Sequence, residues 1–236
     1  MRIQLKNNLR PYMKVETDKN PQNNMLEEET LETSAFRENV FQYRLGQRDL
    51  ILNRDINDSC VEYYMMQILS WNEEDSALIP SARIPITIYI NCDGGDVYTG
   101  LVLCNIIKQS ITPVCGIVLG SASSMGALVL IACHYRYSYT FGNVMLHQCS
   151  LGVNGDLGKV TDVVDFVREK KNAQIKRFIL DNTKVSEALL DQVQLERREW
   201  WLTAEEALML GVIDEIIGFP NVEEEREEDT LVGQTN

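Results

Sequence analysis

The chain has 236 residues, of which 44% are apolar, and it carries a formal net charge of −13 at pH 7. This length and apolar content predict one globular domain with a single substantial core. The acidic balance argues against nucleic-acid binding, which needs clustered lysines and arginines, and no stretch approaches the roughly 20 consecutive apolar residues of a membrane helix.

Residues 1–35 are predicted to form a flexible N-terminal arm, because they are polar and show no sustained period. They also lack the unbroken apolar core of a signal peptide, so a cytoplasmic location is expected. The folded domain is predicted over residues 36–220, with no internal repeat or linker. Residues 221–236 contain an acidic run and are expected to form a flexible tail.

The first part of the predicted domain shows one helix signal and one strand signal. Asp58 is placed to cap a helix whose apolar residues recur at helical spacing. Ile84, Ile86, Ile88 and Ile90 alternate with other residues, which predicts a strand that ends at Asn91.

Helix and strand signals continue to alternate along the rest of the domain. Helices are expected over about 97–109, 122–133, 160–180, 186–195 and 203–210, and strands over 114–119 and 144–148. Strands separated by helices of this length imply right-handed βαβ units and a parallel sheet, so the predicted fold class is α/β. Sites in such sheets form where strands end and helices begin.

The six cysteines form no Cys-x-x-Cys pair, and four of them lie in apolar runs: Cys92, Cys104, Cys115 and Cys133. Buried free thiols in a reducing compartment are therefore expected rather than disulfides or a zinc site. With only two histidines, a histidine-based metal site is not expected either.

Ser124 follows the predicted strand 114–119 within the small-residue segment Gly-Ser-Ala-Ser-Ser-Met-Gly-Ala that starts at Gly120. Small neighbours allow a sharp turn that exposes one hydroxyl at a helix N-terminus, where free N–H groups favour a developing oxyanion. Taken alone, the segment fits a serine N-cap in a close packing contact better than it fits a nucleophile.

His147 lies in the short predicted strand Val-Met-Leu-His-Gln, and it can take a proton from a serine hydroxyl in the neutral pH range. The alternative is a structural histidine at a strand end. The other histidine, His134, ends the helix that follows Ser124. Ten helical residues, each rising about 1.5 Å, would separate the two by roughly 15 Å, so His147 is the only workable base.

Paired glycines follow the isoleucine strand in Asn91-Cys92-Asp93-Gly94-Gly95. Such a pair lets the backbone approach a substrate closely and direct an N–H group at it. A plain turn between strand and helix is the alternative.

These motifs, in this order, resemble the proteolytic subunit of the Clp protease family. The resemblance includes the segments 202–207 and 211–216 and runs from about residue 38 to 217. It implies a crotonase-like spiral of βαβ units with a protruding handle helix at 160–180, and the activity of an ATP-dependent serine endopeptidase. It also implies two stacked heptameric rings and an AAA+ unfoldase partner of the ClpX, ClpA or ClpC type. That partner uses the ATP and supplies unfolded polypeptides, so no cofactor is expected on this chain.

The same resemblance assigns roles to individual residues. Ser124 would be the nucleophile and His147 the general base, while the N–H groups of Gly95 and Met125 would form the oxyanion hole. Gly94 and Asp93 would border the substrate groove. Arg198 matches the family residue that couples ring contacts to the active site.

Two positions depart from the family pattern. The third triad member is an aspartate in the family, whereas Glu199 occupies that position here and is longer by one methylene. Glutamate can orient a histidine as aspartate does, and Asp191 or solvent remains the alternative. The family's Ser-Pro before Gly-Gly is Cys92-Asp93 in this chain, and the added carboxylate could narrow peptide preference or slow acylation.

Other functions fit parts of the same pattern. A phage-type relative would mature capsid proteins without an unfoldase. A catalytically silent ring subunit would serve structure or regulation, and Ser124 and His147 count against it. An acyl-CoA enzyme of the crotonase type could share the fold, but it would have no use for a Ser–His pair.

Overall fold

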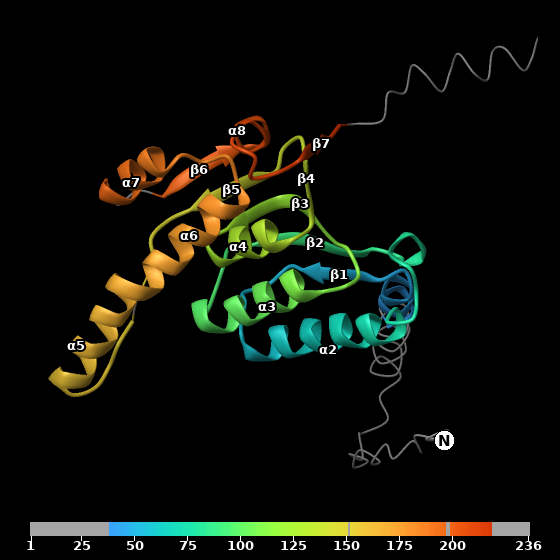
Figure 1. Cartoon of the computed structure of the whole chain (residues 1–236), viewed down its shortest axis with the longest axis horizontal. Helices are drawn as coiled ribbons and strands as arrows, with labels where there is room; N and C mark the ends of the chain where they lie inside the picture. The colour runs from blue at the N-terminus through green and yellow to red at the C-terminus, as the bar shows by residue number, and fades with distance from the viewer. Residues whose placement is uncertain (1–37, 151, 197–198, 219–236) are drawn as a thin grey trace, which may run out of the picture. The chain divides into compact units, whose positions relative to one another are not determined.

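The computed structural model of the chain describes residues 38–150, 152–196 and 199–218. The chain divides into two compact units between Arg44 and Leu45, and residues 38–46 are helical. The predicted arm and tail, both ends of the predicted domain and Arg198 lie outside the described residues. All described strands belong to the second unit (Figure 1).

A mostly parallel sheet forms the framework of the second unit (Figure 1). Its main path runs β1-β2-β3-β4-β7, and β5 pairs with β3 on one side and, antiparallel, with β6 on the other. The strands are β1 (Asp49–Leu52), β2 (Ile86–Cys92), β3 (Val114–Ser123), β4 (Tyr135–Tyr139), β5 (Asn143–Leu146), β6 (Trp200–Thr203) and β7 (Glu215–Ile217). The predicted α/β class with a parallel sheet is confirmed.

Strand β3 changes its partner along its length. Its first half pairs with β4 and its last residues pair with β5. On the other side, Ile90 of β2 lies opposite Val118, but Cys92 lies opposite Ala122. An advance of two residues along β2 therefore matches an advance of four residues along β3, so β3 contains a bulge at this point. A bulge bends the strand that contains it, and here β3 bends toward β5. The carboxyl ends of β2, β3 and β5 thus meet at one edge of the sheet.

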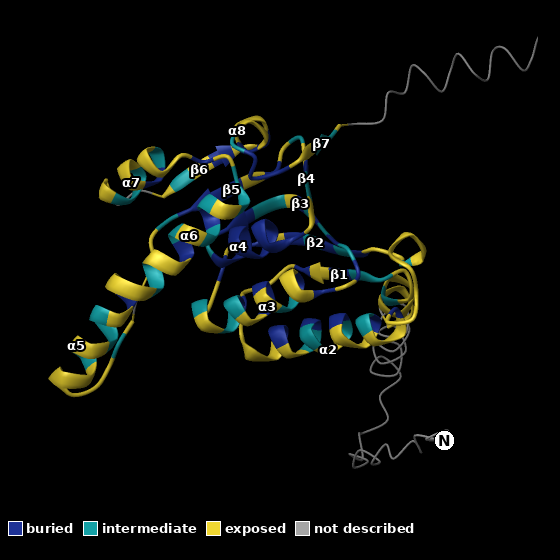
Figure 2. Cartoon of the chain, in the orientation of Figure 1, coloured by how far each residue is buried: buried dark blue, intermediate teal, exposed yellow. Residues whose placement is uncertain are grey.

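Helices cover the sheet and provide much of the core. They are α2 (Asp58–Glu74), α3 (Val97–Gln109), α4 (Met125–Ala132), α5 (Leu157–Phe166), α6 (Asn172–Asn182), α7 (Glu187–Leu195) and α8 (Ala204–Met209), and the turn Pro80–Ala82 is a 3₁₀-helix. Helix α4 is buried along its whole length, as Figure 2 shows in dark blue. A helix with apolar side chains on every face is stable only inside a core.

The predicted boundaries differ from the observed ones for identifiable reasons. Asn57, not Asp58, caps α2, because its side chain accepts from the backbone N–H of Cys60, while Asp58 accepts from the hydroxyl of Thr99. The isoleucine strand begins at Ile86, and Ile84 is exposed. The predicted helix 122–133 begins only at Met125, because the preceding residues extend β3.

The predicted long helix 160–180 is confirmed, and it has two parts. Helix α5 and α6 are joined through a π-helical turn at Val167–Lys171, and α5 extends away from the sheet (Figure 1). Helix α5 has no buried residue, whereas Ile175 and Ile179 of α6 belong to the core. The inner half therefore anchors this helix, and the outer half is the protruding handle.

A buried ion pair ties the start of β1 to the end of α2. Arg48 donates to both carboxylate oxygens of Asp75, at 2.6 and 2.9 Å, and Thr112 donates to the same carboxylate at 2.6 Å. Asp75 is only 1% exposed. The hydrogen bond from Arg48 holds the pKa of Asp75 below its ordinary value.

Candidate active site

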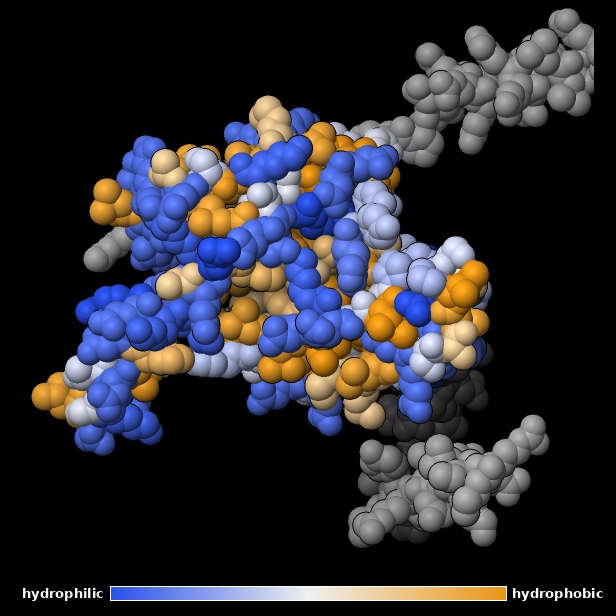
Figure 3. Space-filling model, in the orientation of Figure 1, coloured by the Kyte–Doolittle hydropathy of each residue, from blue (hydrophilic) through white to orange (hydrophobic). Residues whose placement is uncertain are grey.

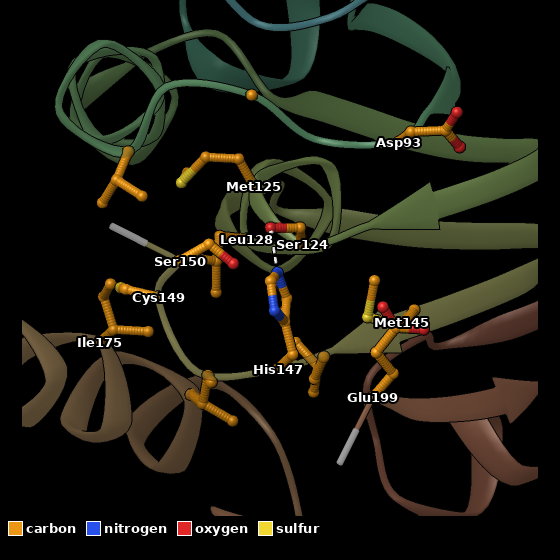
Figure 4. A pocket seen from close by; sticks show the side chains of 14 residues that line it. Asp93, Ser124, Met125, Leu128, Met145, His147, Cys149, Ser150, Ile175 and Glu199 are labelled. Carbon is orange, nitrogen blue, oxygen red and sulfur yellow. Dashed lines mark hydrogen bonds between the residues drawn. The ribbon is translucent and has the colours of Figure 1, made fainter. Parts of the chain in front are cut away.

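The candidate active site lies at the edge where β2, β3 and β5 end (Figure 4). Ser123 at the end of β3 lies opposite Met145 of β5. Ser124 continues this pairing, because its N–H donates to the carbonyl of Met145 at 2.8 Å. His147 follows β5 directly. The pairing of two parallel strands therefore brings together side chains that lie 23 positions apart in the sequence.

Ser124 and His147 are hydrogen-bonded to each other (Figure 4). The distance between Ser124 Oγ and His147 Nε2 is 2.7 Å. A neutral imidazole that carries its proton on Nδ1 accepts this bond, and it can then remove the hydroxyl proton. The predicted nucleophile and base are thus in contact.

The backbone of Ser124 adopts a conformation that few L-residues take. Its φ is 53° and its ψ is −118°, which turns the chain sharply from β3 into α4 and leaves the hydroxyl in a pocket. Small neighbours are required for this turn. A Cβ atom added at Gly94 would lie 2.8 Å from the Cβ of Ser124, and one at Gly126 would lie 2.9 Å from the carbonyl of Cys92.

Neither of the nearby serines, Ser121 and Ser123, is placed to act as the nucleophile instead of Ser124. Their hydroxyls are hydrogen-bonded to each other at 2.7 Å, and Ser123 is 2% exposed.

The other histidine is structural, since Nδ1 of His134 accepts from the backbone N–H of Val114. Burial, together with Lys108, lowers the pKa of His134.

Gly95 and Met125, whose N–H groups are the predicted oxyanion donors, both line the pocket that contains Ser124. Met125 is the first residue of α4, so its N–H has no acceptor within the helix. Gly95 lies opposite Ile56 in an isolated β-bridge, but the neighbours of Gly95 make both of its hydrogen bonds. The carbonyl of Gly94 accepts from the N–H of Ile56, and the N–H of Asp96 donates to the carbonyl of Ile56. Within the described part of the chain, neither N–H takes part in a hydrogen bond between elements. Both residues therefore share the pocket with Ser124, and no backbone carbonyl among the described residues accepts from their N–H groups.

A pocket of about 340 Å³ surrounds the Ser–His pair. Val97, Leu128, Ile175 and Ile179 give it an apolar side, and Figure 3 shows apolar side chains exposed between α6 and α3. In Figure 4, Asp93 and Glu199 lie on the side of the pair away from Ile175, well separated from each other, and Met145 lies beside Glu199.

The structure brings Glu199 into this pocket but does not join it to His147. One oxygen of its carboxylate, Oε2, accepts from the indole N–H of Trp201 at 3.2 Å. No hydrogen bond to Nδ1 of His147 is present among the described residues. Asp191 lies elsewhere, bonded to Lys176 at 2.5 Å and lining a different pocket. Glu199 is thus the better placed of the two carboxylates.

Sequence reasoning missed Trp201 and the residues that follow His147 in the pocket wall. Cys149 and Ser150 line the pocket, and their only sequence signal is the short distance to His147. The six cysteines are free. Cys115 is half-buried rather than buried, and burial raises the pKa of Cys92 to about 11.

The described residues contain no group of three or more His, Cys, Asp or Glu side chains able to hold a metal ion. Within the same residues, no helix is long and apolar enough to span a bilayer.

Residues 32–219 match the family model described as Clp protease. Among curated relatives, ATP-dependent Clp protease proteolytic subunit 3 of Parasynechococcus marenigrum is 32% identical over 184 residues, which cover 75% of this chain and 86% of that protein. Proteolytic subunit 1 of Streptomyces avermitilis is 28% identical over 186 residues, with coverages of 78% and 82%. Proteolytic subunit 2 of Thermobifida fusca is 28% identical over 182 residues, with coverages of 76% and 85%.

Proposed function

The chain belongs to the Clp protease family, and we propose that it is the serine endopeptidase subunit of an ATP-dependent Clp-type protease. The observation that carries this proposal is the 2.7 Å hydrogen bond between Ser124 Oγ and His147 Nε2, at the N-terminus of a buried helix. A silent ring subunit would have no use for this contact or for the strained backbone of Ser124.

The proposed reaction proceeds by acyl transfer. As Ser124 Oγ attacks the carbonyl carbon of a peptide bond, His147 Nε2 takes its proton. The oxygen of the tetrahedral intermediate accepts from the N–H groups of Gly95 and Met125. His147 then gives the proton to the departing amine, and a water molecule, activated by the same histidine, releases the acyl chain.

Glu199 is proposed as the third member of the triad. During the reaction His147 becomes a cation, and a carboxylate on its far ring nitrogen stabilises that charge and favours the tautomer with a proton on Nδ1. Glu199 lines the pocket that holds His147. The Oε1 oxygen, which Trp201 does not use, would accept from Nδ1.

The proposed substrates are unfolded polypeptides. The apolar side of the pocket, with Val97, Leu128 and Ile175, suits an apolar side chain next to the cleaved bond. Asp93 lies on the opposite side, and Gly94 lies beside Ser124, so both would border the groove. The added carboxylate of Asp93 would disfavour acidic substrate residues there.

The proposed assembly is a pair of stacked heptameric rings that works with an AAA+ unfoldase in the cytoplasm. The printed names of the relatives call their proteases ATP-dependent. The unfoldase would use the ATP, so the chain itself would need no cofactor.

Labelling with a fluorophosphonate tests nucleophile, base and oxyanion hole together. We expect the wild-type chain to be labelled at Ser124 and to cleave peptides, and the Ser124→Ala variant to do neither while it still assembles. Ser123→Ala is the matched control and should keep activity. Labelling that survives in Ser124→Ala but disappears in Ser123→Ala would overturn the assignment, and an unlabelled wild-type chain would favour a silent subunit.

A further inference from the structure

We infer that Trp201 is a positioning residue for catalysis: its indole N–H holds the carboxylate of Glu199 in the pocket wall, where that carboxylate acts on His147. The inference rests on the proposed function, in which Glu199 is the acid of the triad. In this inference Trp201 does not contact the substrate, and it affects the reaction only through the carboxylate of Glu199.

The pairing of β5 with β6 places Trp201 beside the site. These strands are antiparallel, and Trp201 lies directly opposite Met145. Met145 lines the pocket, so this pairing brings β6, and Glu199 directly before it, to the pocket wall. Trp201 lies two residues after Glu199, and its indole N–H donates to the carboxylate of Glu199.

The hydrogen bond from Trp201 reduces the freedom of an exposed glutamate. A glutamate has one more rotatable bond than an aspartate and loses more side-chain entropy when it is fixed. The donation from Nε1 to Oε2 at 3.2 Å fixes one oxygen, and no other described residue hydrogen-bonds to Glu199. The second oxygen has no hydrogen bond to a described residue, and in the proposed triad it would accept from His147 Nδ1.

The chemistry of indole suits this role. An indole N–H donates and cannot accept, so Trp201 cannot compete with Glu199 for the proton of His147. Its acceptor is a carboxylate, the kind of acceptor that hydrogen-bonds more strongly than a neutral group, although the 3.2 Å distance is at the long end of the hydrogen-bond range. Trp201 is 52% exposed, so the ring contributes little to the core, and the bond to Glu199 is its distinguishing contact.

Trp201→Phe tests the inference, because it keeps an aromatic ring and removes the N–H. We expect kcat for a fluorogenic peptide with an apolar residue before the cleaved bond to fall on the order of tenfold, the usual effect of losing one hydrogen bond to a charged group. KM should not change. The rate of fluorophosphonate labelling should fall by the same factor. Trp200→Phe is the matched control and should keep both rates.

A double-mutant cycle separates positioning from a structural effect. In a Glu199→Gln background, Trp201→Phe should cost almost nothing further, because the group through which it acts is already lost. An equal loss in both backgrounds would show a structural role and overturn the inference. An unchanged or faster Trp201→Phe enzyme would also overturn it.

The failure of the inference can be distinguished from failure of the proposed function. If Ser124→Ala abolishes labelling but Glu199→Gln is fully active, the assignment of the acid is wrong and the role of Trp201 fails with it. If both of those variants lose activity and only Trp201→Phe is normal, the peptidase proposal stands and the positioning role is refuted.

Discussion

At the scale of single residues, the proposed role of Glu199 as the acid beside His147 can be tested by substitution. Glu199→Gln should keep the fold and lower kcat by on the order of 10² to 10⁴, because the amide no longer stabilises the imidazolium or its productive tautomer. Glu199→Asp should be tolerated if the loop moves inward by about one methylene. Steady-state peptide hydrolysis, with circular dichroism as a check on folding, measures both effects.

The matched control for this substitution is Asp191→Asn. Asp191 is bonded to Lys176 and lies outside the pocket that holds His147, so this variant should keep normal turnover. The reverse result, a normal Glu199→Gln enzyme and an impaired Asp191→Asn enzyme, would identify Asp191 as the acid.

The sequence was sufficient to predict the Ser–His contact but not the surroundings of Glu199. Ser124 and His147 follow strands with strong apolar patterns, so their position at the edge of the sheet can be derived from the order of the elements. The bond between Glu199 and Trp201 depends on the register of β6 against β5. Nothing in the local sequence of a four-residue strand specifies that register.

At the scale of the elements, length and periodicity decide what a sequence reveals. Helices α2 and α3 and strand β2 carry long apolar patterns, and all three were predicted. Strand β4 has the sequence Tyr-Arg-Tyr-Ser-Tyr, in which aromatic and polar residues alternate as they do in strands, so the sequence contains a local strand signal that the predicted elements omit. The alternation does not match the burial, because Tyr135 and Tyr139 are exposed and Ser138 is buried. Pairing with β3 and β7 on both sides decides the burial in β4.

The ion pair between Arg48 and Asp75 should make the free energy of unfolding depend on pH. Asp75→Asn should destabilise the chain by about 3 kcal/mol at pH 7, because Arg48 loses its buried partner. The pKa of Asp75 is lowered in the folded state, so its contribution is full above the ordinary aspartate pKa of about 4 and is lost as the pH falls through the folded value.

Urea denaturation of both proteins at several pH values measures this difference. The difference in the free energy of unfolding between the wild-type chain and Asp75→Asn should be constant from about pH 7 to pH 5 and should decrease below about pH 4. Thr112→Val, which removes a donor but keeps the ion pair, should cost less. A gap that widens on acidification would contradict the assigned direction of the pKa shift.

At the scale of the whole molecule, the handle should lead the chain to assemble. Helix α5 has no buried residue although it carries several apolar side chains, and Leu157 and Phe166 are 82% and 46% exposed. Apolar surface of this kind is usually covered by another subunit. Multi-angle light scattering should therefore give a mass many times the 26.9 kDa of one chain, and a stable monomer at micromolar concentration would contradict this prediction.

The turn at Ser124 also implies a trade-off between activity and thermal stability. Glycine adopts a positive φ without the steric cost that a Cβ atom imposes, and that cost is about 1–3 kcal/mol at such positions. Ser124→Gly should therefore melt at a higher temperature than Ser124→Ala, although both are inactive, and differential scanning calorimetry compares them directly. The most stable version of this fold would then be one that cannot cut a peptide bond, so selection for catalysis keeps the chain below its stability optimum.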